Sequence, residues 1–226
     1  MTLFIKHNWW KLLSGILLLY AIIAGFTSDI PVKPITEQTM RNLFYHVGMW
    51  FAMMAMLLTG FIYSIRYLSG FKEKEDIVAV EAVNVGLMFG FLGIITGMIW
   101  ANFTWGSPWV KDPKLNGAAV GLIIYLAYTV LRGSIDDVHK RAKVAAVFNI
   151  FAFVLWIVFV IILPRLAGDS LHPGTGNNVV PVMPMHLDPS MRLVFYPAML
   201  GWILLGFWIV NIRVRIRKIK FNLENR

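Results

Sequence analysis

The chain has 226 residues, of which 58% are hydrophobic and only 15% are charged. A soluble domain has roughly 45–50% apolar and about 25% charged residues, so these apolar side chains exceed what a soluble core could bury and must face lipid. The chain has no cysteine, which excludes disulfides, thiolate metal sites and a cysteine nucleophile. The net charge of +9 does not by itself indicate a nucleic-acid partner, because in a membrane protein the placement of the charges matters more.

A helix that crosses a membrane needs about 20 mostly apolar residues. Six stretches meet this requirement, at about 11–27, 43–68, 82–100, 118–132, 144–164 and 194–212. No small-residue cleavage signal follows the first stretch, so we interpret it as a retained span. Connections are expected at 28–42, 69–81, 101–117, 133–143 and 165–193. The sequence therefore predicts an all-α integral membrane protein with six transmembrane helices in a single domain, residues 1–226.

The basic residues alternate between the two sides of these six spans. One side, with both termini and the 69–81 and 133–143 connections, carries 15 Lys and Arg, and the other carries 6, which together are all 21. Basic segments resist translocation, so both termini should be cytoplasmic. The basic run from Arg213 to Lys220 is then expected to anchor the chain at membrane lipid headgroups rather than to bind nucleic acid.

The connection at about 100–117 carries a helix-start pattern on the outer side. Ser107 followed by Pro108 combines a capping hydroxyl with proline at the first helical position. One helical turn would place Trp109 and Asp112 on one face. Pro113 disfavours helical geometry at Asp112, so this predicted turn should end there.

The same connection displays a set of aromatic side chains around that single carboxylate. They are Trp100, Phe103, Trp105 and Trp109. An aromatic belt at the membrane interface is the simpler explanation, and it accounts for scattered residues such as Trp9 and Trp10. It accounts less well for three tryptophans within ten residues, so a binding surface is the alternative that stays open.

Three of the five histidines are expected on the outer side: His46, His172 and His186. His46 lies in an otherwise apolar span, where an ionisable side chain indicates a functional site. Two imidazoles from separate connections with an aromatic platform between them suit haem, whose iron is held by histidine. The basic residues available for the haem propionates are Arg41, Lys111, Lys114 and Arg192. Zinc or copper is the weaker alternative, because neither needs an aromatic surface.

Other chemistry is poorly represented in the sequence. There is no GxxxxGK[ST], GxSxG or HExxH motif, and the acidic residues are expected only in loops and tails. A haem b electron carrier linked to quinone would place its histidines within facing spans, but here only His46 lies in a span. A small-solute transporter would need polar groups in the middle of interrupted helices, and Asn84 and Asn149 are too few and too near the span ends.

Three segments of the chain resemble one known family. The segment from Trp100 to Leu115 resembles the tryptophan-rich "WWD" signature of the haem-handling proteins of cytochrome c maturation. The pattern RNLFYH before an outer connection and the six-span length are similar to the heme exporter protein C (CcmC) family. SLHPG resembles that family's LHxG motif, and DPSMR its DPxMR motif. The resemblance covers essentially the whole chain.

The resemblance implies which residues hold the cargo. His46 and His172 match the family's axial ligands of the haem iron, and Arg41 and Lys114 fall where the family keeps basic residues near the propionates. The positions that match the haem-presenting WWD loop are Trp105, Gly106, Trp109, Asp112 and Leu115. Pro108 and Lys111 stand where the usual motif has further tryptophans, which leaves a smaller aromatic surface and one added positive charge.

The resemblance also implies a function at the outer face of a bacterial inner membrane. The expected protein binds haem b and delivers it to a periplasmic haem chaperone, beside the subunits of an ATP-binding cassette complex that supplies the energy. No general acid or base can be assigned, so we do not expect a hydrolase or a redox enzyme. Attachment of haem to the chaperone would count as a lyase activity, and the sequence leaves that assignment open.

The fifth connection offers two histidines for one ligand position. His172 lies about seven residues beyond Pro164, close to the expected end of the fifth span, whereas His186 lies in the middle of the connection. Ordering a loop costs roughly 1–2 kcal/mol per residue, so the histidine near the packed helices is favoured. We therefore expect His172 to be the ligand opposite His46.

Overall fold

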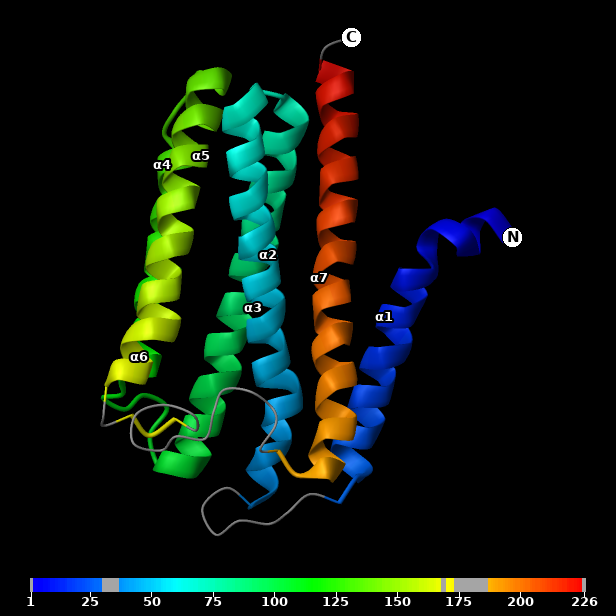
Figure 1. Cartoon of the computed structure of the whole chain (residues 1–226), viewed down its shortest axis with the longest axis vertical. Helices are drawn as coiled ribbons and strands as arrows, with labels where there is room; N and C mark the ends of the chain where they lie inside the picture. The colour runs from blue at the N-terminus through cyan, green and yellow to red at the C-terminus, as the bar shows by residue number, and fades with distance from the viewer. Residues whose placement is uncertain (1, 30–36, 168–169, 173–186, 225–226) are drawn as a thin grey trace.

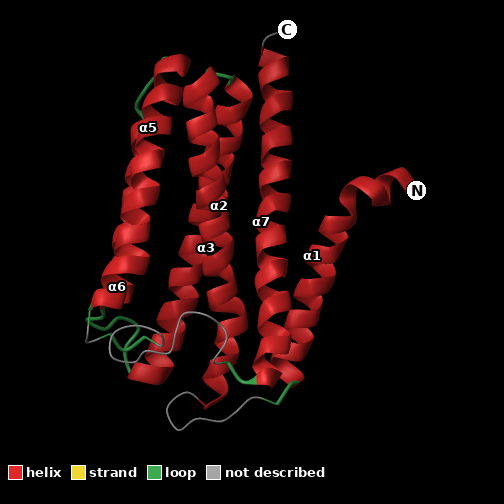
Figure 2. Ribbon diagram, in the orientation of Figure 1, coloured by secondary structure: helices red, strands yellow, loops and turns green. Residues whose placement is uncertain are grey.

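The structure is a computed structural model that describes residues 2–29, 37–167, 170–172 and 187–224. Every element in these ranges is helical, and the connections between α2, α3, α4 and α5 are short (Figure 2). The helices are α1 (Thr2–Thr27), α2 (Leu43–Gly70), α3 (Glu73–Trp105), α4 (Pro113–Gly133), α5 (Val138–Ile157), α6 (Leu163–Leu166) and α7 (Pro189–Glu224). A 3-10 turn, Glu37–Asn42, precedes α2, and a π-helical turn, Val158–Ile162, joins α5 to α6.

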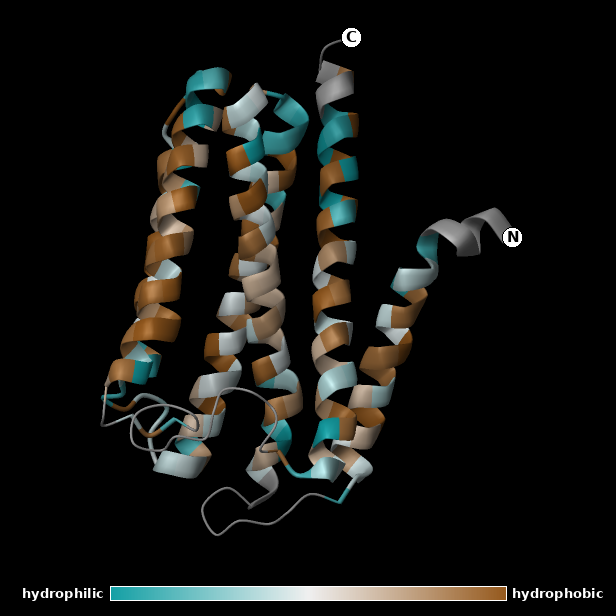
Figure 3. Cartoon of the chain, in the orientation of Figure 1, coloured by the Kyte–Doolittle hydropathy of each residue, from teal (hydrophilic) through white to brown (hydrophobic). Residues whose placement is uncertain are grey.

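Six helical segments of the described chain are long and apolar enough to cross a membrane, with α5, the π turn and α6 forming one of them. The predicted all-α, six-span class is therefore confirmed. The helices run roughly side by side, and both ends of the chain lie toward the same end of the bundle (Figure 1). Hydrophobic residues fill the middle of the helices, and hydrophilic ones gather at the end where α2 meets α3 (Figure 3).

The two central helices, α2 and α3, form an antiparallel pair, and α4, α5 and α7 each pack against one or both of them (Figure 1). Their buried contacts come from Met53, Met56, Leu57 and Val83, all fully or almost fully hidden from the surface. α7 packs against α2, α3 and α1, whereas α4 packs mainly against α5. α1 is the most peripheral span, since few of its residues are buried within the chain.

The expected connection at 69–81 is wrong, because only Phe71 and Lys72 separate α2 from α3. Phe71 adopts the left-handed conformation (φ 49°) and its N–H donates to Tyr67 O, which ends α2. Three acidic residues then occupy the first turn of α3, where carboxylates are favoured by the helix dipole. The connection between α2 and α3 is shorter than expected because the charged residues that hydropathy assigned to it belong to the first turns of α3.

The expectation that acidic residues lie only in loops and tails is also wrong. Glu75, Asp76 and Glu81 lie in α3, and all three are buried. A buried carboxylate is tolerated only with a charged partner, and each of these has at least one arginine. Asp76 forms a bidentate pair with Arg132 of α4, and the Nη1 to Oδ1 distance is 2.8 Å. Hydropathy alone therefore assigns these acidic residues to a connection, because it does not take into account the arginines that neutralise them inside the helix bundle.

The other two buried acids bind the ends of α2 and α7. Glu81 accepts hydrogen bonds from Arg213 and Arg217 of α7, both at 2.6 Å. Arg66 of α2 lies 3.4 Å from Glu75. We call the end of the bundle that carries Asp76, Glu81 and their arginine partners the arginine end.

Candidate functional site

The expected outer connection at about 100–117 is mostly helical. Trp100 and Trp105 lie on α3, which ends when Gly106 adopts the left-handed conformation (φ 75°) that only glycine adopts without strain. Lys114 lies in the first turn of α4. The segment between the two helices is therefore only residues 106–112, and the tryptophans are held by a rigid helix rather than by a loop.

The predicted helical turn from Ser107 to Asp112 is wrong. Ser107 Oγ instead lies 3.4 Å from the N–H of Trp109 and 2.9 Å from its carbonyl oxygen, in a local turn without helical bonds. The helix begins five residues later than predicted, with Asp112 as the cap and Pro113 at its first position. Ser107-Pro108 and Asp112-Pro113 both combine a capping residue with a proline. Only Asp112-Pro113 is followed by an apolar run long enough to offset the unfavourable free energy of helix nucleation.

Asp112 is the centre of the hydrogen bonds at this end. Its fully buried carboxylate accepts bonds through Oδ1 from the N–H groups of Lys114 (2.8 Å) and Leu115 (3.2 Å). Through Oδ2 it accepts bonds from Ser170 Oγ (3.0 Å) and Leu171 N–H (2.8 Å). One side chain thus joins the start of α4 to a segment nearly sixty residues further along the chain.

The same carboxylate holds the imidazole of His172, with Nδ1 3.0 Å from Oδ1. Burial alone would raise the pKa of Asp112, but the hydrogen bonds from His172, Leu171 and Leu115 outweigh burial and hold that pKa well below its usual range. Burial lowers the pKa of His172, although the bond to Asp112 opposes this. The pair is therefore a neutral imidazole beside an ionised carboxylate at neutral pH.

This arrangement fixes the tautomer of His172. An ionised carboxylate can only accept, so Nδ1 must carry the proton and Nε2 must carry the lone pair. A histidine that donates one ring N–H to a carboxylate is the usual arrangement of a metal-binding histidine, because the bond orients the ring and raises its basicity.

Two tryptophans of α3 flank the His172 ring. The centroid of Trp105 lies 5.0 Å from that of His172, at 72°, and the centroid of Trp100 lies 6.3 Å away. Trp100 and Trp105 also contact each other edge to face, at 4.9 Å. Two of the four aromatic residues expected in this surface, Trp100 and Trp105, therefore lie beside one of the two predicted ligands, whereas Phe103 is exposed.

His46 lies on α2 and faces α3. Its Nδ1 is 3.0 Å from Thr96 Oγ1, and that hydroxyl is 2.8 Å from the carbonyl oxygen of Leu92. If the threonine proton goes to Leu92, the hydroxyl accepts the Nδ1 proton of His46 and leaves the lone pair on Nε2, as in His172. His46 and His172 also lie within electrostatic range of each other and of Lys114.

Glycine at position 97 makes room for the His46 ring. A Cβ atom on Gly97 would lie 2.8 Å from His46 Cε1, closer than atoms can pack. Trp50 contacts the other side of the ring, edge to face at 6.3 Å. Thr96, Gly97, Trp50 and Ser170 were missed by sequence reasoning. The only signals were a Thr-Gly pair inside an apolar span and a serine just before Leu171 and His172.

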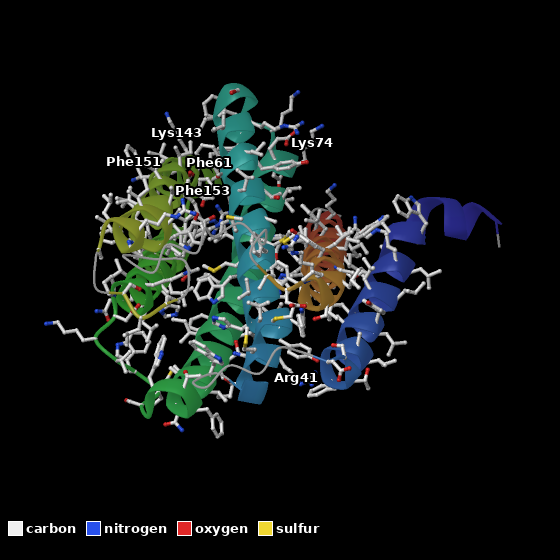
Figure 4. The ribbon with its side chains drawn as sticks, turned by 60° about the horizontal axis from the view of Figure 1, so that its bottom comes forward. Arg41, Phe61, Lys74, Lys143, Phe151 and Phe153 are labelled. Carbon is white, nitrogen blue, oxygen red and sulfur yellow. The ribbon has the colours of Figure 1, made fainter. Side chains whose placement is uncertain are left out.

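Arg41 and Trp109 make none of the contacts described above around His46 and His172. Arg41 donates to the carbonyl oxygens of Gly25 (2.7 Å) and Ser28 (3.0 Å), at the end of α1 (Figure 4). Trp109 is 39% exposed. His186 lies outside the described residues. We call the end of the bundle that carries His46, Trp105, Asp112 and His172 the histidine end; it lies opposite the arginine end.

Comparison with known proteins identifies one family over the whole chain. The family model described as Heme exporter protein C matches residues 3–226. The chain is 24% identical over 219 residues to "Heme exporter protein C" of Escherichia coli (strain K12), which covers 92% of this chain and 81% of that protein. It is 24% identical over 153 residues to the protein of the same name in Haemophilus influenzae, covering 66% of this chain and 58% of the other.

A second group of relatives carries a different name. The chain is 32% identical over 118 residues to "Cytochrome c biogenesis protein CcsA" of Pelargonium hortorum, which covers 52% of this chain but 36% of that protein. The CcsA protein of Cuscuta reflexa is 26% identical over 164 residues, with 52% of its length covered. The chain thus spans about a third to a half of the length of these CcsA relatives.

Proposed function

Because the chain belongs to the heme exporter protein C family, we propose that it is a haem-handling membrane protein of cytochrome c maturation. It binds haem b at the histidine end and delivers it to a periplasmic haem chaperone. In this proposal the histidine end faces the periplasm, across the inner membrane of a bacterium. The single domain of residues 1–226 supplies the whole haem surface, from Trp100 to Lys114 together with His46 and His172.

The observation that carries the proposal is that each of the two histidines has a hydrogen-bond partner at Nδ1. His172 donates its Nδ1 proton to Asp112, and His46 directs Nδ1 to Thr96. In each ring Nε2 is then the nitrogen able to bind iron. Both rings lie at the same end of the bundle, beside the aromatic surface of Trp100 and Trp105. This donor set fits haem, whose iron takes two axial imidazoles.

The roles proposed for Asp112, Trp100, Trp105 and Lys114 rest on their contacts and charges. Asp112 is a positioning residue, because it acts on haem through the orientation and basicity of His172. Trp100 and Trp105 exclude water from one side of the imidazole and offer a flat apolar face. Lys114 interacts electrostatically with both Asp112 and His172, which supports a role in neutralising a propionate. Gly106 and Trp109 are assigned to the same surface by their position in the connection that follows Trp105, and Arg41 is a second candidate for a propionate.

Delivery requires a site that holds haem without enclosing it. Trp109 is partly exposed on the short connection between α3 and α4, which leaves this edge accessible to a partner. The chain has no nucleotide-binding motif of its own, so an ATP-binding cassette complex would supply any energy that delivery needs. The partners in this proposal are therefore the chaperone, the subunits of that complex and the surrounding lipid.

Removing each candidate ligand tests the proposal. His46→Ala and His172→Ala should each reduce the haem that copurifies with the protein by about tenfold or more, and weaken the low-spin absorption bands. His139→Ala, at the other end of the bundle, is the control and should keep its spectrum. His186→Ala should also keep it. Loss of the bands in His186→Ala with retention in His172→Ala would reverse the ligand assignment, and the absence of a Soret band from the unaltered protein would refute haem binding.

A further inference from the structure

Two neighbouring cavities open at the arginine end, far from the proposed haem site. The larger has a volume of about 530 Å³ and lies between the ends of α2, α3, α4, α5 and α7. The smaller has a volume of about 290 Å³ and lies beside it. Arg132, Arg141 and Arg217 line both cavities. A small-molecule site typically occupies about 300–1,000 Å³, so the larger cavity has room for a ligand group.

The charges around the larger cavity do not balance. Its lining includes four basic side chains, Arg132, Arg141, Arg217 and Lys220, but only two carboxylates, Glu73 and Asp76. Asp76 is already engaged by the guanidinium of Arg132. Arg217 is likewise engaged by Glu81, so among the described residues Arg141 is the lining arginine that no carboxylate pairs with, and its charge would attract an anion.

The arginines around this cavity also outnumber the carboxylates that hold them. Glu81 is shared between Arg213 and Arg217, so one carboxylate serves two guanidinium groups. The half-buried side chain of Arg141 has no ion-pair partner within the described ranges 2–29, 37–167, 170–172 and 187–224. A guanidinium beside a cavity with several unused N–H groups is suited to bind a phosphate with two parallel hydrogen bonds.

Apart from His139, the rest of the lining is mainly apolar. Tyr67, Phe71, Ile77 and Val138 complete the wall, and Phe71 and Val138 are 60% and 52% exposed. The cavity lies where the apolar parts of the helices end, which is the level of the headgroups of a bilayer. Basic pockets between membrane helices at this level are suited to anionic headgroups, whose glycerol and acyl parts can follow the apolar wall outward.

We propose that the cavity lined by Arg132, Arg141 and Arg217 binds the phosphate of an acidic phospholipid headgroup. The phosphate accepts hydrogen bonds from Arg141 and compensates its positive charge. A zwitterionic lipid is bound less well, because its own ammonium group meets the same arginines. The bound lipid fills the space between α7 and the pair α4 and α5, which otherwise contact each other little.

Native mass spectrometry of the full chain in a mild detergent tests this proposal. Phosphatidylglycerol, phosphatidylethanolamine and inorganic phosphate are offered separately. We expect a retained adduct with phosphatidylglycerol, and about tenfold weaker retention in Arg141→Gln, as for loss of one charge-assisted contact. Lys143→Gln is the matched control, since Lys143 is also on α5, is exposed and does not line either cavity (Figure 4).

The possible results separate the proposal from simpler explanations. Retention that falls equally in Arg141→Gln and Lys143→Gln would overturn it in favour of general surface charge. Equal retention of phosphatidylethanolamine, or a phosphate adduct that competes fully with the lipid, would overturn the assignment of a lipid headgroup. The melting temperature of each variant shows that it is folded. The proposal does not depend on haem, so the haem spectrum of Arg141→Gln should be unchanged.

Discussion

The Asp112 carboxylate accepts five hydrogen bonds. Two of them, from the N–H groups of Lys114 and Leu115, are ordinary helix-capping bonds, and two come from Ser170 and Leu171, nearly sixty residues further along the chain. The fifth, from His172, is the one that bears on iron binding. Asp188 offers a natural comparison, because it also precedes a proline at a helix start and accepts bonds from Ser190 N–H (2.9 Å) and Oγ (2.6 Å). Asp112 differs from the exposed Asp188 in being fully buried and in accepting bonds from Ser170, Leu171 and His172.

Asp112→Asn should weaken haem binding by roughly 10- to 100-fold, as for the loss of other partners of metal-binding histidines. The amide is neutral and presents a donor where the carboxylate accepted, so it no longer fixes His172 as a basic ligand. The reduction potential of any remaining bound haem should rise, because a less basic imidazole stabilises the ferric iron less.

Asp188→Asn is the control for the capping role. It should lower stability slightly and leave haem content and reduction potential unchanged. Equal effects of the two variants on haem content would mean that Asp112 acts only as a helix cap.

Trp105 and Trp109 are close in sequence but differ in their contacts. The ring centroid of Trp105 lies 5.0 Å from that of His172, whereas the side chain of Trp109 is 39% exposed. We therefore expect Trp105→Ala to reduce copurified haem more than Trp109→Ala, and the double variant to reduce it most, with the protein still present in the membrane. Trp9→Ala, on the peripheral helix α1, should have no effect. A loss of haem in Trp9→Ala equal to that in Trp105→Ala would support an interfacial belt.

At the scale of elements, the contact between α4 and the end of α5 depends on a missing side chain. Pro164 has no N–H, so the carbonyl of Phe159 in the π-helical turn cannot receive a bond from it. Gly117 of α4 lies against this carbonyl oxygen, and a Cβ atom there would overlap it severely. Gly117 thus allows α4 to approach the π-helical turn closely, near the histidine end.

Gly117→Ala should destabilise the protein by about 1–3 kcal/mol, because backbone rather than a flexible side chain must move to admit the methyl group. Thermal unfolding in detergent measures the change. Gly133→Ala, at the other end of the same helix, is the control. A Cβ atom at Gly133 meets nothing, so that variant should be neutral or more stable by up to about 1 kcal/mol. A wild-type melting temperature in Gly117→Ala would show that α4 and α5 can separate without cost.

At the scale of the whole molecule, the six spans place both ends of the chain at the arginine end (Figure 1). The count of 15 basic residues against 6 predicts that this end is cytoplasmic. Reporter fusions after residues 226 and 110 should therefore report the cytoplasm and the periplasm, respectively. A periplasmic report after residue 226 would turn His46 and His172 toward the cytoplasm and remove delivery to a periplasmic chaperone.

The sequence alone was sufficient to predict the six spans, the all-helical class and the family. The reason is that lipid acts on each segment separately, so a run of apolar residues indicates a span wherever it packs. The same local reading failed at the helix ends, where α3 includes both acidic residues and tryptophans that were expected in connections. It also placed a helix start at Ser107 instead of Asp112, since a capping pattern does not reveal which following segment will pack.

Only the tertiary structure decided which distant residues are partners. Asp112 and His172 are 60 residues apart, and His46 and Thr96 are 50 apart. Asp76 and Arg132 are 56 apart. Each pair depends on how two helices are placed against each other, and small residues such as Gly97 and Gly117 determine that placement by allowing close approach. Sequence reasoning was able to propose His46 and His172 as ligands. The contacts that fix their tautomers, with Thr96 and Asp112, depend on the packing of α2, α3 and α4.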